Sequence, residues 1–454
     1  MPIGDELMKP RLAEQIVSFL RLARVQECDP DFRKWNERQW ARTMQWLDDS
    51  GLAFYFQQRL KEREATASIP DWVSAQLESN CSLNRQRTED LGQRFARINA
   101  LFTEAGIPYA AIKGFSLVPQ FCPSSPLRYQ GDFDYLVDEH SLLEARTVLL
   151  SLGYTERKSR SAQETIFLSP GASAPLRNGR QYSPHSPHAV ELHLDVWDAS
   201  LHGLPLLPRL FSTESLSVSH VDGKAFPSLH DEDAFLLQIL HACHHLFTHW
   251  IRMSCLLEIA YFMNRNAENW ELWDRIDRRV GGNPLLREFT ALVVGMATQL
   301  FDCPIPPQIH VWQEQLRPGP RLWVERYARD WAFGDVPVHE LSFFPNSKLV
   351  LFLHQQYRDW PNSGRDPRQS RRASASRLSR ILSSIRNHPT SLLKRRWWKP
   401  QLLVRRTIFH AFAGIRYACE TPRWHWRLRK MTVSPPDERP TVIPLRRLPP
   451  SKPL

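Results

Sequence analysis

Two aspartates separated by one residue, Asp132 and Asp134, are the part of this sequence best suited to chemistry. They begin the segment DFDYLVD, whose apolar residues predict a β-strand. Side chains at positions i and i+2 of a strand point to the same face, so the two carboxylates can share divalent cations, while Phe133 and Tyr135 point into the packing. The spacing therefore predicts a metal-binding pair for divalent cations.

A third acidic group is expected on a neighbouring strand, because two-metal phosphoryl transfer needs a ligand or base near the attacking hydroxyl. The alternating segment HAVELHLDVWD predicts such a strand, with Glu191, His193 and Asp195 on its polar face. Glu191 is the preferred third carboxylate, and Asp195, about 13 Å further along an extended chain, is the alternative. His193 is expected to hydrogen-bond one of the aspartates and to hold the ligand geometry.

The loop before the aspartates contains residues that suit a triphosphate. It follows a first predicted strand in GIPYAAIKG, where Gly114 allows a sharp turn. The short helix expected after this turn, which contains Ser116, would direct backbone N–H groups toward an anion. Lys113 and Arg128 add positive charge at the two ends of the loop, where either can neutralise a leaving pyrophosphate. These four residues form the predicted nucleotide-binding group.

Three histidines, His241, His245 and His249, recur every four residues in a segment with helical periodicity. A helix would align their imidazoles along one stripe, which is a spacing that can bind zinc. The stripe lacks the glutamate base of an HExxH motif. The preferred interpretation is that one or two of the histidines line the nucleotide cleft, and a zinc hydrolase is kept as an alternative.

The elements that must position these side chains follow from changes of periodicity along the chain. Helical spacing over residues 1–100 predicts an N-terminal helical region, and strands alternating with short helices over 101–230 predict the α/β core. Helical spacing returns over 231–345 and predicts a second helical domain. Residues 346–454 are expected to form a basic, partly disordered C-terminal extension. The predicted fold class is therefore α+β, with a small mixed β-sheet flanked by helical regions.

The composition is that of a multidomain protein without a membrane-spanning segment. The 454 residues are enough for two or three cores at about 100 to 200 residues per domain. Mean hydropathy is −0.42, and no window approaches the roughly 20 apolar residues of a membrane-spanning helix. The start of the chain shows no signal-peptide pattern and the seven cysteines form no CxxC pair, so a cytoplasmic protein with reduced thiols is expected.

The formal net charge of +11 is concentrated toward the C-terminal end of the chain. Beyond about residue 365 many arginines and lysines are mixed with aromatic residues, namely Trp397, Trp398, Phe409, Phe412, Trp424 and Trp426. This combination suits nucleic acid, an acidic polymer or an anionic membrane surface equally well. An extension without any specific ligand is the other interpretation.

Taken together, these motifs resemble the uncharacterised nucleotidyltransferase family of the polymerase-β-like superfamily. The resemblance covers about residues 10–310, and its motifs are Lys-Gly at 113–114, Arg128, Gly-Asp-Phe-Asp at 131–134, Glu-Leu-His at 191–193, the histidine-rich helix at 241–249 and LFDCPIP at 300–306. The superfamily's usual turn is Gly-Gly or Gly-Ser, whereas this chain has Gly114, Phe115 and Ser116. Glu191 stands where the family often has aspartate.

The resemblance implies a small mixed sheet in which Asp132, Asp134 and a third acid, Glu191, bind magnesium and the Gly114 turn binds phosphate. The expected activity is transfer of a nucleoside monophosphate from a nucleoside triphosphate to an unidentified hydroxyl or phosphate acceptor, with release of pyrophosphate. Two alternatives remain open at this point. One is a non-catalytic protein of the same fold that binds nucleic acid or an anionic membrane, and the other is the zinc hydrolase.

Overall fold

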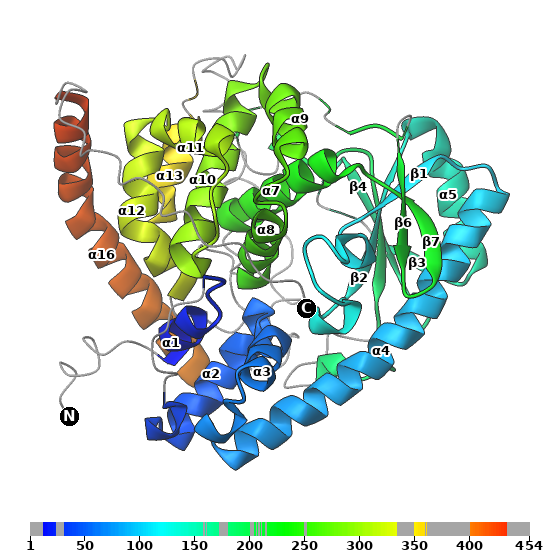
Figure 1. Cartoon of the computed structure of the whole chain (residues 1–454), viewed down its shortest axis with the longest axis horizontal. Helices are drawn as coiled ribbons and strands as arrows, with labels where there is room; N and C mark the ends of the chain where they lie inside the picture. Colours follow the sequence, from blue (N-terminus) through cyan, green and yellow to red (C-terminus); the bar gives the residue numbers. More distant parts are fainter. Residues whose placement is uncertain are drawn as a thin grey trace.

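A seven-stranded mixed sheet and the helices around it account for the described part of the chain in the computed structural model (Figure 1). The structure describes residues 12–23, 31–157, 159, 161–171, 180–199, 204–205, 207, 209, 211–213, 216–248, 252–333, 349–358, 360 and 400–433. The α+β fold class predicted from the sequence is confirmed.

Among the described residues, four α-helices precede the sheet. They are α1 (Leu12–Phe19), α2 (Glu37–Ser50), α3 (Ala53–Glu62) and α4 (Asp71–Glu104). A capping box formed by Asn36 and Gln39 begins α2, and Gly51, in the left-handed conformation, ends it. The long helix α4 runs along the outside of the sheet (Figure 1) and buries Leu91, Phe95, Ile98 and Phe102.

The strands order as β3-β4-β5-β2-β1-β7-β6 across the sheet. Their bounds are β1 Tyr109–Ile112, β2 Asp132–Val137, β3 Thr155–Arg157, β4 Glu164–Leu168, β5 Ala189–His193, β6 Ser217–Val221 and β7 Lys224–Ser228. The centre is mixed, because β2 is parallel to β5 and antiparallel to β1. The register places Asp134 opposite Glu191, which brings two predicted site residues onto adjacent strands.

The two faces of the sheet pack into different hydrophobic cores. Phe133 and Tyr135 of β2 enter a core with α4 and with α5 (Glu139–Ser151). Ala110 and Leu136 point the other way, into a larger core shared with the helices that follow the sheet. Because side chains alternate along a strand, the carboxylates of β2 lie on this second face, between the sheet and those helices.

Helices that follow the sheet form the second layer. They are α7 (Asp231–Thr248), α8 (Met253–Arg265), α9 (Trp270–Val280), α10 (Pro284–Phe301), α11 (Pro307–Glu314), α12 (Pro318–Phe333), α13 (Val350–Arg358) and α16 (Pro400–Val433). Their apolar side chains belong to the same core cluster as those of α1, α2 and α3. The N-terminal and C-terminal helical regions are therefore packed together, although the sheet separates them in sequence.

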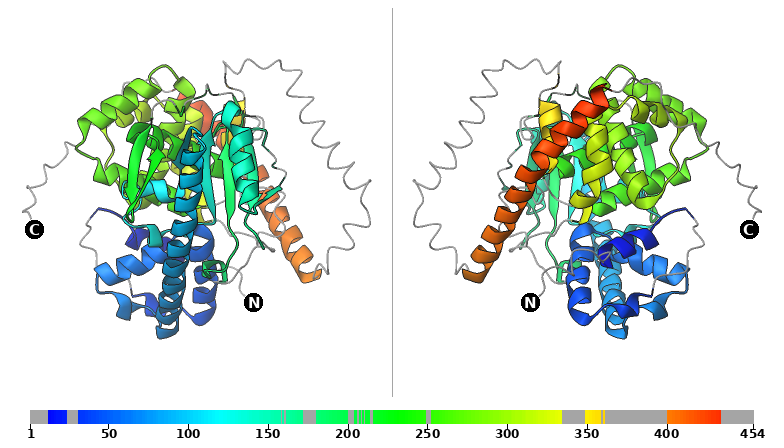
Figure 2. Two further views of the ribbon diagram at one scale, coloured as in Figure 1. Left: turned by 90° about the vertical axis from the view of Figure 1, so that its right-hand side faces the viewer. Right: turned by 90° about the vertical axis from the view of Figure 1, so that its left-hand side faces the viewer.

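Part of the basic C-terminal region is a helix packed on the rest of the molecule. α16 lies along the outside of α12 (Figure 2), and Trp424 is buried with its ring 4.9 Å from that of Phe352. The arginine-rich residues 361–399 and the proline-rich residues 434–454 lie outside the described residues. Within the described part of the chain, no helix has both the length and the apolar character needed to cross a membrane.

Arg87 of α4 fixes the approach to both carboxylate strands. Its side chain is fully buried and donates hydrogen bonds to four backbone carbonyl groups. One acceptor is Gln130, just before β2, and the others are Ser183, Ser186 and Pro187, before β5. A single guanidinium therefore ties the two loops that set the relative position of β2 and β5.

We expect Arg87→Met to lower the free energy of unfolding by about 2–4 kcal/mol, because it removes hydrogen bonds from a charged donor and leaves buried carbonyls unpaired. Urea denaturation followed by circular dichroism measures this change. The matched control is Arg94→Met on the same helix, whose exposed ion pair with Asp90 predicts a change within about 0.5 kcal/mol. Equal stability of the two variants would contradict the role given to Arg87.

Candidate active site

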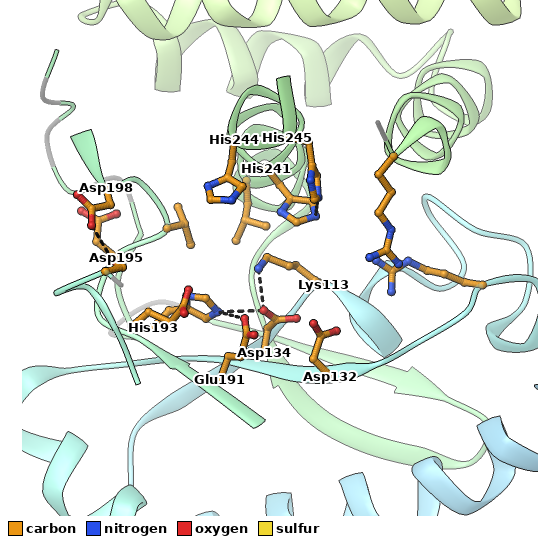
Figure 3. A pocket seen from close by; sticks show the side chains of 16 residues that line it. Lys113, Asp132, Asp134, Glu191, His193, Asp195, Asp198, His241, His244 and His245 are labelled. Carbon is orange, nitrogen blue, oxygen red and sulfur yellow. Dashed lines mark hydrogen bonds and ion pairs between the residues drawn. The ribbon is translucent and has the colours of Figure 1, made fainter. Parts of the chain in front are cut away.

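The predicted carboxylates line a cleft between the sheet and α7 (Figure 3). Asp132, Asp134 and Glu191 rise from the strands that form its floor, while the histidines of α7 point down from its roof. Lys113 reaches in between the two layers. The cleft therefore brings together residues that are more than 100 positions apart in the sequence.

Asp134 is the most strongly bound of the three carboxylates. Its Oδ1 accepts hydrogen bonds from Lys113 Nζ at 2.7 Å and from His193 Nε2 at 2.9 Å. Burial alone would raise the pKa of Asp134, but these two positive partners hold it well below its usual range. Asp134 is therefore ionised, and the predicted hydrogen bond from His193 to an aspartate is present in the structure.

His193 and Lys113 are both cations in this environment. Burial and the nearby Lys113 would lower the pKa of His193, yet its hydrogen bonds to Asp134 and Glu191 raise it to about 9. Burial would likewise lower the pKa of Lys113, but the charges of Asp134 and Glu191 raise it to about 12. Two positive groups thus lie among three carboxylates, and both of them hydrogen-bond Asp134.

Asp132 and Glu191 are less well neutralised. Burial and the charge of Asp134 raise the pKa of Asp132. Burial raises the pKa of Glu191 to about 7, even though its Oε2 lies 3.5 Å from His193 Nε2. Carboxyl groups that are removed from water without a matching cation behave in this way. Asp132 and Glu191 can therefore bind an additional positive group.

The turn after β1 holds Lys113 in an unusual conformation. Lys113 has φ 57° and ψ −163°, a region that costs a non-glycine residue about 1–3 kcal/mol. Ser116 Oγ donates to the Lys113 carbonyl at 2.8 Å and closes the turn. Gly114 has φ 49°, and a Cβ there would lie 2.5 Å from the side-chain nitrogen of Gln130. That Gln130 side chain donates in turn to the carbonyl of Asp132.

Two of the four predicted nucleotide-binding residues therefore act on the shape of the turn. Gly114 and Ser116 are not among the residues that line the cleft: Ser116 hydrogen-bonds the turn itself, and Gly114 lies against the Gln130 side chain. The helical turn at Gly114–Leu117 has only four residues. Lys113 does line the cleft, because the turn directs its side chain toward Asp134.

Arg128 lines the cleft but is held in a buried ion pair. Its Nε lies 3.1 Å from Glu258 Oε1 of α8, and both side chains are almost inaccessible to solvent. Burial would lower the pKa of Arg128, but Glu258 raises it well above its usual range. Arg252, at the start of α8, supplies a second guanidinium to the cleft and donates to the Tyr129 carbonyl at 3.2 Å. Arg252 was not predicted from the sequence.

Asp195 lies at the edge of the cleft. Strand β5 ends at His193, so the alternation that the sequence suggests does not continue to Asp195. Its carboxylate accepts the backbone N–H of Trp197 at 3.2 Å and lies apart from Asp132 and Asp134 (Figure 3). Glu191, by contrast, is directly opposite Asp134 in the β2–β5 ladder. Of the two alternatives for the third carboxylate, the geometry favours Glu191.

The histidines of α7 form the roof. His241, His244 and His245 line the cleft, while His249 lies outside the described residues. His241 Nε2 and His245 Nε2 are 3.1 Å apart, and burial lowers the pKa of both rings well below the usual value. Two histidines of the predicted stripe, His241 and His245, therefore line this cleft, and their position beside a nucleotide stays a prediction.

Two groups of side chains among the described residues have the donor atoms and the proximity to hold a metal ion. One is Asp134, Glu191 and His193, with one ligand atom of each within 4.8 Å of the others. The second is His241, His245 and Cys255, within the same limit. Asp132 lies beside the first group on the same strand face.

The chain matches a known sequence family. A sequence model described as an uncharacterised nucleotidyltransferase matches residues 36–302, which is more than half of the 454 residues. The matched segment contains every residue that lines the cleft. No curated protein matches the chain.

Proposed function

Because the chain belongs to the uncharacterised nucleotidyltransferase family and is an enzyme of nucleotidyl transfer, we propose that this cleft performs the reaction with a divalent metal. The substrate in this proposal is a nucleoside triphosphate, and the acceptor is a hydroxyl or phosphate group of an unidentified molecule. The acceptor oxygen forms a bond to the α-phosphorus, the bond between the α-phosphorus and the bridging oxygen breaks, and pyrophosphate leaves.

One observation carries the proposal. Three carboxylates project from two adjacent strands into the same cleft wall, with Asp134 directly opposite Glu191. Lys113 and Arg252 add positive charge to that cleft. Carboxylates that hold a cation beside groups that neutralise phosphate are the combination that phosphoryl transfer requires.

The donor set suits Mg²⁺, or Mn²⁺ in its place. Asp132, Asp134 and Glu191 offer hard carboxylate oxygens, which are the ligands that these ions prefer. The Lys113 ammonium already lies among these carboxylates, so their arrangement accommodates a positive charge. A bound magnesium ion would supply charge neutralisation at the phosphates.

The protein's own residues have distinct tasks in this proposal. Lys113 and Arg252 bind phosphate oxygens and draw charge toward the leaving pyrophosphate. Arg128 keeps α8 in place through its ion pair with Glu258 rather than contacting phosphate directly. Glu191 accepts the proton of the acceptor hydroxyl, and His193 holds Asp134 and Glu191 in position.

Two differently labelled forms of each nucleoside triphosphate test the proposal. Purified full-length protein, incubated with cell extract and an α-³²P-labelled nucleotide, should transfer label to an acceptor when Mg²⁺ is present. The γ-³²P-labelled form should release its label as pyrophosphate and transfer none. Chelation with EDTA should stop the reaction. Incorporation of the γ-label would instead indicate phosphoryl transfer by a kinase, and α-label transfer in EDTA would exclude the metal.

We further propose that the basic C-terminal region binds an anionic polymer or an anionic membrane surface. The observation that supports it is the charge of α16, whose exposed residues include Arg429 and Lys430 and the aromatic Phe412 and Trp426. Arg416 and Arg423 are exposed as well, but they pair with Asp330 and Glu420. Lys430 lies 4.1 Å from the ring centroid of Trp426. Such a basic and aromatic surface attracts phosphate groups.

A further inference from the structure

A second cluster of ligand-type side chains lies in the roof of the cleft, away from the carboxylates of the floor. His241 and His245 are one turn apart on α7, and Cys255 comes from the first turn of α8. One ligand atom of each residue lies within 4.8 Å of the other two. The sequence places the histidines on one stripe with His249, whereas the structure gives them a cysteine from the next helix as their third partner.

The spacing of the two imidazoles is that of a chelating pair. In a tetrahedral zinc site, with Zn–N bonds of about 2.05 Å, the two nitrogens are about 3.3 Å apart. His241 Nε2 and His245 Nε2 are 3.1 Å apart, and their rings are inclined by 77°. In the structure these nitrogens share a hydrogen bond, so a metal ion would take the place of the shared proton.

The cysteine completes a ligand set with limited movement. With a Zn–S bond of about 2.3 Å, the sulfur would lie about 3.6 Å from each nitrogen, so Cys255 needs to approach by no more than about 1.2 Å. Cys255 and His245 are both buried, and both border a small cavity beneath α10 and α12. Neutral imidazole nitrogens and a thiolate favour zinc and other late transition metals over magnesium.

We propose that His241, His245 and Cys255 form a zinc site that joins α7 to α8 in the roof of the cleft. This site goes beyond the proposed transfer reaction, whose metal ligands are the carboxylates of the floor. Its fourth position faces the cleft, because His241 and His245 both line it, and a water or an anionic group of the substrate would occupy that position. The thiolate would offset part of the repulsion from Lys113, Arg128 and Arg252, which line the cleft together with His241 and His245.

Cobalt binding to the full-length protein tests the site, because a cobalt ion bound by a thiolate gives a sulfur-to-metal charge-transfer band and visible bands typical of tetrahedral coordination. After removal of metals by EDTA and dialysis, Co²⁺ should produce both sets of bands with a stoichiometry of one. Added Zn²⁺ should abolish them. Cys255→Ser should lose the charge-transfer band, and His241→Ala and His245→Ala should each raise the Kd about 10²-fold or more.

Three further variants distinguish this site from its neighbours. Cys243→Ser changes another buried cysteine on α7, and His244→Asn changes the histidine next to His245, yet neither residue belongs to the cluster. Glu191→Gln removes a ligand from the carboxylate group of the floor. All three should retain the charge-transfer band when circular dichroism shows a native fold. Absence of the band in the wild-type protein, or its persistence in Cys255→Ser, would overturn the zinc site without affecting the proposed transfer reaction.

Discussion

Asp132→Asn is expected to reduce magnesium-dependent nucleotidyl transfer by about 10³-fold or more, since the substitution removes a metal ligand and its charge where the phosphates would bind. The folded structure should tolerate the change. The pKa of Asp132 is raised by burial and by Asp134, which means that folding disfavours its charged form, so a neutral amide does not destabilise the protein near pH 7. Transfer rates and urea unfolding curves measure the two effects.

Asp134→Asn should lose transfer to the same extent but should also lose stability. The pKa of Asp134 is held low by Lys113 and His193, so its charge stabilises the fold above its unfolded pKa, and that contribution disappears in the variant. Asp138→Asn is the matched control, because Asp138 follows the other end of β2 and pairs with Arg209 outside the cleft. Wild-type transfer by a natively folded Asp132→Asn variant would refute the assigned centre.

Glu191→Gln is expected to retain nucleotide binding, and magnesium binding through Asp132 and Asp134, and to lose transfer by about 10²-fold or more, within the range of general-base effects. The expectation rests on the position of Glu191, opposite Asp134 and 3.5 Å from His193. The amide keeps the size of the side chain but cannot accept the acceptor's proton. Nucleotide binding is followed by calorimetric titration, and transfer by release of pyrophosphate.

Asp195→Asn serves as the comparison for Glu191→Gln. Its carboxylate is engaged by the backbone N–H of Trp197, beyond the end of β5, and we expect at most a few-fold change in transfer. The assignment fails if Asp195→Asn is the variant that binds nucleotide and cannot transfer it, while Glu191→Gln remains active.

Some strands were missed although the sequence contains a signal for them. β6 and β7 form a hairpin whose two-residue turn, Asp222-Gly223, has positive φ at both positions. An Asp-Gly pair between two short β-prone segments is typical of such a turn. The composition around this turn resembles that of a loop, so the two strands were not predicted from the sequence. The hairpin extends the sheet beyond β1, since β7 pairs with β1.

The sequence by itself determined the floor of the cleft. The period of two along a strand is a local property, and it was enough to place Asp132 with Asp134 and to send Phe133 into the core. The same rule held for Glu191 and His193, but not for Asp195, because a strand ends where its ladder ends and the sequence pattern does not mark that point.

Only the tertiary structure decided which groups face these carboxylates. Lys113 pairs with Asp134 because the strained turn directs it there, while Arg128 is taken by Glu258, 130 residues away in sequence. Because α8 packs against α7, Arg252 lines the cleft and Cys255 lies beside the histidines of its roof. Such pairings depend on how elements that are distant in sequence pack together. Hydrophobic periodicity predicts which faces of these elements are buried, but it does not predict which polar side chains then come into contact.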